Sequence, residues 1–199
     1  MAGPPAEAAP TGTPVIVLAA GQSSRLGEPK GLVVVEGRTW IDRQLEALGG
    51  RRAVLVLGHD RDRYLPVILA LGRPVDLVTN PDPDRGPFSS LQEGLAAVDA
   101  GSAAFVLPVD VPAPGKAVWE ALEASLGAAE AAVPVHEGKG GHPVLLGPAL
   151  VARLLTRPAS SRLDEELRAL PLVARVPVDD PRVGLNLNTA SDWGRVREG

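Results

Sequence analysis

The chain contains no cysteine among its 199 residues. Disulfide bonds, thiolate catalysis and zinc sites with thiolate ligands are therefore excluded. Aromatic residues make up only 3% of the chain, so a core has to be built from valine, leucine, isoleucine and alanine. No apolar run reaches the roughly 18 residues of a membrane-spanning helix. The net charge of −4, from 24 acidic against 20 basic residues, argues against a general nucleic-acid binder.

Hydrophobic residues nevertheless account for 45% of the chain, which is typical of a globular protein. The length suits one domain with a sizeable core. Residues 1–13 are rich in alanine, proline and glycine and have neither the basic start nor the apolar stretch of a signal peptide. We therefore expect a disordered tail over residues 1–13 and one domain over residues 14–199. We also expect a cytoplasmic monomer or small homo-oligomer that binds neither membranes nor nucleic acid.

Short apolar runs alternate along the chain with segments whose apolar residues recur at helical spacing. The runs are rich in β-branched residues, as buried strands are. This alternation predicts a single three-layer α/β/α domain in which helices cover both faces of a doubly wound, mostly parallel sheet. The expected strands are 15–18, 53–57, 75–78, 103–107, 131–135, 144–146 and 173–176, with a short extended segment at 32–35, and the expected helices lie near 39–48, 64–69, 89–98, 118–125, 149–155 and 163–170, with a short one at the C-terminus.

The first predicted strand opens into a loop of small and polar residues, so that residues 15–30 read VIVLAAGQSSRLGEPK. Ala19, Ala20 and Gly21 are small enough for a ligand to lie against the backbone. Arg25 and Lys30 add two cations. A buried strand that leads into a cationic loop rich in amide groups suits an anion, above all a polyphosphate. The loop matches neither G-x-x-x-x-G-K-[ST] nor G-x-G-x-x-G.

Loops after later strands are further candidates, because ligands of open parallel sheets bind beyond the carboxyl ends of the strands. Asn80 follows the third predicted strand. Ser89 and Ser90 stand at the start of a predicted helix, where free backbone amides favour an anion or a polar base edge. Simple N-capping of that helix by either serine is the alternative.

Asp110 follows the fourth predicted strand and is flanked by Pro108 and Pro112. A carboxylate at the end of a strand can hold Mg²⁺, which prefers one or two carboxylates together with substrate phosphates. A turn-forming aspartate in a proline-rich loop is the alternative. Opposite a loop suited to phosphate, the metal role is the stronger interpretation.

The motif L-A-A-G-x-S-x-R-x-G-x-x-K resembles the signature of nucleotidyltransferases of the molybdenum-cofactor type. These are small α/β proteins that transfer a nucleoside monophosphate from an NTP to a phosphorylated acceptor. The resemblance implies a Rossmann-like nucleotidyltransferase fold and a Mg²⁺-dependent enzyme with an NTP and a phosphorylated small molecule, such as molybdopterin cofactor, as partners. The matching residues are Leu18, Ala19, Ala20, Gly21, Ser23, Arg25, Gly27 and Lys30.

The resemblance also implies roles for individual residues. Two groups of residues are implied in nucleotide binding. The first belongs to the motif and comprises Leu18, Ala19, Ala20, Gly21, Ser23, Arg25 and Lys30. The second belongs to the second substrate loop and comprises Asn80, Ser89 and Ser90. Catalysis falls to Arg25, Lys30 and Asp110. In the family, the position of Asp110 is the principal metal-binding aspartate.

The family usually carries an acidic D-x-D-T-P-x-D-like motif near its C-terminus, whereas residues 186–192 of this chain read NLNTASD. An amide oxygen can still coordinate Mg²⁺ but contributes no negative charge. Asn188 therefore stays a candidate metal ligand beside Asp110. Asp192 is expected to be a helix-terminal acid.

Gly141, His142 and Pro143 resemble a G-H-P motif that lies beside the acceptor in the cytidylyl-transferring branch of the family. Ala20 favours the same branch, because its methyl group would crowd a purine more than a pyrimidine. CTP is thus the expected donor. Gly86-Pro87 and residues 186–189 lean towards the guanylyl-transferring branch, which is the alternative. A sugar phosphate or another small phosphate as acceptor, and a non-catalytic nucleotide-binding module, are also open.

Asp164 stands where the cytidylyl-transferring branch has an acidic residue in a G-D-x-G-x-R motif, but the glycines are missing here. Recognition of the acceptor is therefore expected to differ from that branch. Arg162 is expected to be a solvated charge at a helix end and not a ligand of the acceptor phosphate.

Overall fold

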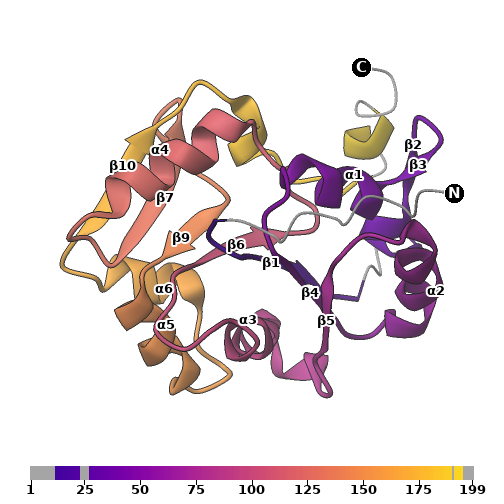
Figure 1. The fold of residues 1–199 in the computed structure, drawn as a ribbon, viewed down its shortest axis with the longest axis horizontal. Helices are drawn as coiled ribbons and strands as arrows, with labels where there is room; N and C mark the ends of the chain where they lie inside the picture. Colours follow the sequence, from indigo (N-terminus) through magenta and orange to yellow (C-terminus); the bar gives the residue numbers. More distant parts are fainter. Residues whose placement is uncertain (1–11, 23–26, 190, 195–199) are drawn as a thin grey trace, which may run out of the picture.

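The computed structural model describes residues 12–22, 27–189 and 191–194 (Figure 1). One sheet of eight strands has the order β10-β7-β9-β6-β1-β4-β5, with β8 paired to β7. No helix within the described residues is both long enough and apolar enough to cross a membrane. The strands of the sheet are β1 (Val15–Ala19), β4 (Ala53–Leu57), β5 (Asp76–Thr79), β6 (Ala104–Pro108), β7 (Ala131–His136), β8 (Lys139–Gly140), β9 (Val144–Leu146) and β10 (Val173–Pro177).

Most strand pairs in the sheet are parallel, as the alternation of strands and helices predicted. β1 runs parallel to both of its neighbours, β4 and β6. The exceptions are β8, which turns back antiparallel along β7, and β9, which lies antiparallel between β6 and β7. The carboxyl ends of β1, β4 and β6 consequently meet at one edge of the sheet.

Helices cover both faces of the sheet, which confirms the three-layer α/β/α architecture (Figure 1). Val15 and Val17 of β1 belong to the core cluster under α1, α2 and α4. Ile16, between them, belongs to the cluster under α3 and α5, because successive strand residues point to opposite faces. The helices are α1 (Trp40–Ala47), α2 (Arg61–Leu71), α3 (Pro87–Ala96), α4 (Lys116–Leu126), α5 (Pro148–Leu155) and α6 (Leu163–Arg168), with 3₁₀ turns η1 (Lys30–Leu32), η2 (Pro83–Arg85) and η3 (Pro181–Gly184).

The segment expected to be extended at 32–35 divides between two structures. Its first residue ends η1, and its last two form β2 (Val34–Val35), which pairs with β3 (Arg38–Thr39) in a small hairpin. Glu36 and Gly37 connect the two strands with φ angles of +49° and +76°. Two consecutive positive φ angles are the geometry of a tight hairpin turn.

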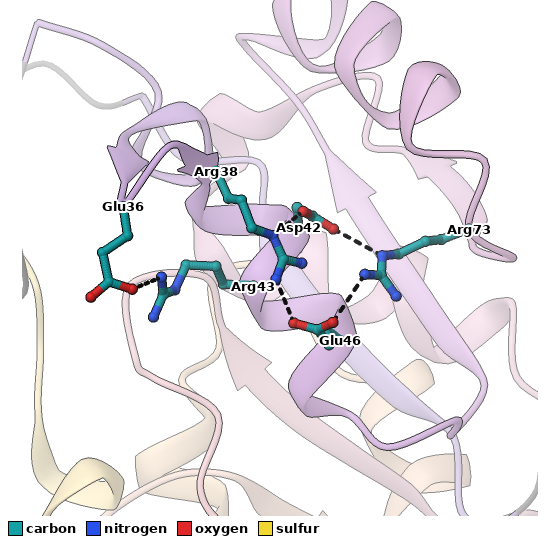
Figure 2. A network of polar contacts seen from close by, with 6 residues as sticks. All are labelled: Glu36, Arg38, Asp42, Arg43, Glu46 and Arg73. Carbon is teal, nitrogen blue, oxygen red and sulfur yellow. Dashed lines mark hydrogen bonds and ion pairs between the residues drawn. The ribbon is translucent and has the colours of Figure 1, made fainter.

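A polar network ties this hairpin to α1 and to the segment after α2 (Figure 2). Arg38 donates to Asp42 over 2.6 Å and to Glu46 over 2.7 Å. Arg73 donates to the other carboxylate oxygen of Asp42 over 2.8 Å. The hydrogen bond from Arg38, with that from Arg73, holds the pKa of the Asp42 carboxyl below its ordinary value. The charged form of Asp42 is thus favoured in the folded protein.

The free energy of unfolding should therefore decrease as the pH is lowered through the titration of Asp42. A carboxyl whose folded pKa is depressed stabilises the fold above its unfolded pKa and loses that contribution as pH falls through the folded pKa. We expect Asp42→Asn to cost about 1 kcal/mol of unfolding free energy at pH 7, and this cost should shrink in acid. Urea denaturation at pH 7 and in acid measures this cost. Asp62→Asn, on the exposed start of α2, is the control. An equal cost at every pH would contradict the assignment.

Candidate functional site

A cavity of about 340 Å³ opens at the edge where β1, β4 and β6 end, and we call it the strand-end cavity. Backbone hydrogen bonds join the loops around it: Val109 donates to Leu18 over 3.0 Å, and His59 donates to Ala20 over 3.4 Å. The predicted site residues that line it are Leu18, Ala19, Ala20, Gly21, Lys30, Ser90 and Asp110.

Lys30 and Asp110 line the strand-end cavity, and Asn188, from a third part of the chain, meets them at the Lys30 ammonium. The Lys30 ammonium donates to Asp110 Oδ2 over 2.7 Å and to Asn188 Oδ1 over 2.6 Å. The side chains of Lys30 and Asp110 are only 21% and 18% exposed. The structure thus brings together one predicted catalytic cation and both predicted metal ligands.

The backbone explains how Asn188 reaches Asp110. Leu187 is buried, and its N–H donates to the carbonyl of Asp110 over 2.8 Å. Asp192 accepts from the N–H groups of Asn188 and Thr189 over 3.1 and 2.8 Å, while its own N–H donates to the Thr189 hydroxyl over 3.2 Å. This reciprocal cap confirms that Asp192 is a helix-terminal acid, and it fixes the segment that carries Asn188.

Tyr64 of α2 holds the segment that begins with Lys30. Its hydroxyl accepts from the N–H of Gly31 over 2.9 Å. Burial raises the pKa of the Tyr64 hydroxyl, so it stays protonated. A Cβ atom on Gly31 would lie 2.6 Å from the Tyr64 ring, a distance at which the backbone or the ring has to move. Only glycine allows this close approach.

Gly31→Ala should accordingly destabilise the fold by about 1–3 kcal/mol, the usual cost of overpacking a buried contact. Gly184→Ala is a matched control, since a Cβ atom there meets no atom within 4 Å, and it should change stability by less than about 0.5 kcal/mol. Urea denaturation measures both. Equal stability of the two variants would show that the Tyr64 contact yields without cost.

A buried hydrogen-bonded cluster between β5 and α3 consists of Asn80, Ser89 and Ser90. The Asn80 amide donates to both serine hydroxyls, over 2.8 and 2.9 Å, and Ser89 donates to the carbonyl of Gly86 over 2.8 Å. The alternative of N-capping is wrong: α3 begins at Pro87, its N-cap is Gly86, and no side chain caps it. Of the three residues, only Ser90 lines the strand-end cavity, while nucleotide binding by all three stays a prediction.

A second cavity of about 280 Å³ adjoins the first and shares Leu18, Pro87 and Pro108 with it. We call it the acceptor-side cavity after the acceptor residues that the resemblance predicts. Of the predicted acceptor residues Gly141, His142 and Pro143, only His142 lines it. Burial lowers the pKa of His142, which favours the neutral imidazole. Its Nδ1 is buried and has no hydrogen-bond partner among the described residues.

The lack of a side chain on Gly141 lets the backbone before His142 lie close to Val183. A Cβ atom on Gly141 would lie 2.1 Å from the carbonyl oxygen of Val183, and His142 donates to that same carbonyl over 2.8 Å. Arg162, expected to be a solvated charge, is exposed and paired with Asp164 over 3.1 Å. Both residues nevertheless line the acceptor-side cavity.

Two predicted residues, Ser23 and Arg25, lie outside the described residues. His59 and Tyr64 also line the strand-end cavity, and sequence reasoning missed both. His59 lies 3.3 Å from Asp84 across the cavity rim. The rule that ligands bind after strands could have found His59, which follows the second predicted strand. Tyr64 looked like an ordinary core residue of a helix.

The donor set at Asp110 and Asn188 fits a divalent cation that is bound together with phosphate. The residues that the structure describes contain no group of three or more histidine, aspartate or glutamate side chains suited to a metal. Mg²⁺ does not need one, since it usually takes one or two carboxylates and completes its oxygen shell with water and substrate phosphates. The carboxylate and amide oxygens already converge on one cation, the Lys30 ammonium.

The fold and the site define an α/β protein with a cavity where its parallel strands end, lined by a lysine and an aspartate. The chain belongs to the family of MobA-like NTP transferase domains, whose profile matches residues 15–174. It is therefore a nucleotidyltransferase, as the L-A-A-G motif implied. The molybdenum cofactor guanylyltransferase of Acidiphilium cryptum is 31% identical over 193 residues, which cover 92% of this chain and 93% of that protein. The guanylyltransferase of Ectopseudomonas mendocina is 32% identical over 88% of this chain and 87% of its own.

Solved structures agree with this fold. Rv0371c from Mycobacterium tuberculosis superposes with a TM-score of 0.79 at 26% identity, over 95% of this chain and 100% of that chain. Molybdopterin-guanine dinucleotide biosynthesis protein A from Archaeoglobus fulgidus superposes with a TM-score of 0.72 at 22% identity, over 94% and 97%. A manganese complex of Rv0371c is similar to this chain in fold, with a TM-score of 0.74.

Proposed function

We propose that this chain transfers a nucleoside monophosphate from an NTP to a phosphorylated acceptor of the molybdopterin type and releases pyrophosphate. The observation that carries the proposal is the meeting of three side chains: Lys30 and Asp110 line the cavity built by the L-A-A-G motif, and Asn188 accepts from the same Lys30 ammonium. The ammonium suits the phosphates of a metal–triphosphate complex, and the carboxylate and amide oxygens suit its metal.

The reaction asks for positioning and charge neutralisation more than for covalent chemistry. An oxygen of the acceptor phosphate attacks the α-phosphorus, and the bond to pyrophosphate breaks. Lys30 would pair with the β- and γ-phosphates of a bound NTP and stabilise the charge that develops on the leaving pyrophosphate. Asp110 and Asn188 would hold a divalent cation, which would supply positive charge to the phosphate oxygens. A phosphate nucleophile is already ionised, so no general base is needed.

The two adjoining cavities suit the two substrates. The strand-end cavity holds Lys30 and Asp110 and is assigned to the NTP. The acceptor-side cavity combines the apolar side chains of Phe88 and Leu91 with the polar groups of His142 and Arg162, and is assigned to the acceptor. Pro108 lines both cavities and lies two residues before Asp110. A phosphate in either cavity would therefore lie close to the proposed metal ligands.

The base of the donor is a separate question, and we propose GTP. Relatives that match about nine-tenths of this chain are guanylyltransferases. The CTP expectation depended on the methyl group of Ala20. Ala20 is only 3% exposed and packs within the core cluster of Ile16, Phe88 and Leu91, so little of the methyl is left to select a base. CTP remains the alternative, supported by Gly141-His142-Pro143.

Competition between the two donors tests this assignment. We expect kcat/KM for GTP to exceed that for CTP by at least about tenfold, the discrimination that a few pocket contacts provide. Ala20→Gly should leave the ratio nearly unchanged. A preference for CTP that erodes in Ala20→Gly would instead return the steric role to Ala20 and move this chain to the cytidylyl-transferring branch.

A further inference from the structure

The Lys30 ammonium contacts the same two oxygens that the proposed function assigns to a divalent cation. It lies 2.7 Å from Asp110 Oδ2 and 2.6 Å from Asn188 Oδ1. Two cations cannot share that position, because both need the same lone pairs and they repel one another. At 21% and 18% exposure, solvent screens this pair less than it screens a surface ion pair. Lys30 and the cation are therefore alternatives at this point.

We propose that Lys30 is a built-in counter-ion that keeps free divalent cation off Asp110 and Asn188 until a triphosphate draws its ammonium away. The inference rests on the proposed function, since it takes the metal ligands from there. Asp110 supplies a single negative charge, which Lys30 balances. A divalent ion that approaches alone meets a carboxylate that is already paired with a cation, whereas the metal–triphosphate complex brings its own phosphate oxygens. The site thus admits the complex and rejects the free ion.

The local structure allows this exchange without movement of the backbone. The hydrogen bond from Gly31 to the buried Tyr64 hydroxyl anchors the residue next to Lys30. Lys30 itself lines the strand-end cavity, and a lysine side chain is a point charge on a flexible four-carbon stem. Rotation of that stem suffices to move the ammonium from Asp110 to a phosphate in the same cavity.

Mn²⁺ titration of the full chain, followed by electron paramagnetic resonance of the free ion, tests the proposal. Without nucleotide, Lys30→Met should bind Mn²⁺ at least about tenfold more tightly than the wild type, as expected when a charged hydrogen-bond competitor is removed. Lys30→Arg keeps the charge and should stay near the wild type. Lys116→Met removes an exposed lysine on α4 and should change nothing. Asp110→Asn combined with Lys30→Met should abolish the gain.

A second readout should move in the opposite direction. Lys30→Met should bind a non-hydrolysable fluorescent GTP analogue with Mn²⁺ at least about tenfold more weakly, because the phosphates lose their cation. Simple misfolding would weaken both kinds of binding. Unchanged or weaker Mn²⁺ binding by a Lys30→Met variant that urea denaturation shows to be folded, or a gain that survives Asp110→Asn, would overturn the proposal. Pyrophosphate release by the wild type reports separately on the proposed function, so either can fail alone.

Discussion

Asp110→Asn is expected to reduce metal-dependent nucleotidyl transfer by more than about 100-fold in kcat/KM. Of the two side chains that accept from Lys30 in these hydrogen bonds, Asp110 brings a carboxylate and Asn188 brings an uncharged oxygen. The substitution keeps the size of the side chain and removes its charge, so the cation loses its anionic protein ligand. Weak NTP binding through the cations of the first loop should remain.

The matched control is Asp84→Asn, which removes an equal charge from the cavity rim, where Asp84 is 85% exposed beside His59. Its kcat/KM should stay within a few-fold of the wild type. The measurement is pyrophosphate release across a Mg²⁺ titration for the wild type and both variants. Retention of full Mg²⁺ dependence in Asp110→Asn, or its loss in Asp84→Asn, would move the metal site away from Asp110.

Lys30→Ala is expected to cost at least about 2 kcal/mol of transition-state stabilisation, the usual contribution of one preorganised electrostatic donor. The loss should appear in kcat/KM, because the ammonium stabilises the charge of the leaving pyrophosphate. Since Lys30 also pairs with Asp110 over 2.7 Å, the unfolding free energy should fall by about 1 kcal/mol. Arg25→Ala carries the same kinetic expectation from the motif alone.

Lys116→Ala serves as the control for Lys30→Ala, since Lys116 forms an exposed ion pair on α4. Steady-state kinetics and urea denaturation of the same preparations separate catalysis from folding. Near wild-type turnover by Lys30→Ala would remove the role of Lys30 towards the triphosphate. A loss of activity that only matches a loss of folded protein would reduce Lys30 to a structural residue.

The sheet and its layers could be predicted from the sequence because each depends on local patterns. The run from Val15 to Leu18 is apolar without interruption, and strands buried on both faces require that. The antiparallel entry of β9 could not be predicted in the same way. Three apolar residues at 144–146 carry no signal of direction, which depends on the turn through Gly138 and Gly140 and on pairing with β6 and β7.

The site could be predicted in part for the same reason. The strand-end rule brings Lys30 and Asp110 together, since both follow adjacent parallel strands. Asn188 was found only through the resemblance, because 158 positions separate it from Lys30 and no local pattern links them. Ser89 and Ser90 show the limit of local reading, since a serine near a helix start can cap the helix, bind a ligand or bond to Asn80 in the interior.

The most direct test of the account follows the two ends of the triphosphate in one reaction. The wild-type chain is incubated with Mg²⁺, molybdopterin cofactor and GTP radiolabelled either at the α- or at the γ-phosphate. We predict that the α-label enters the acceptor and that the γ-label leaves in pyrophosphate, in equal amounts and only when the acceptor is present. Transfer of the γ-label to the acceptor, or release of inorganic phosphate without acceptor, would contradict nucleotidyl transfer.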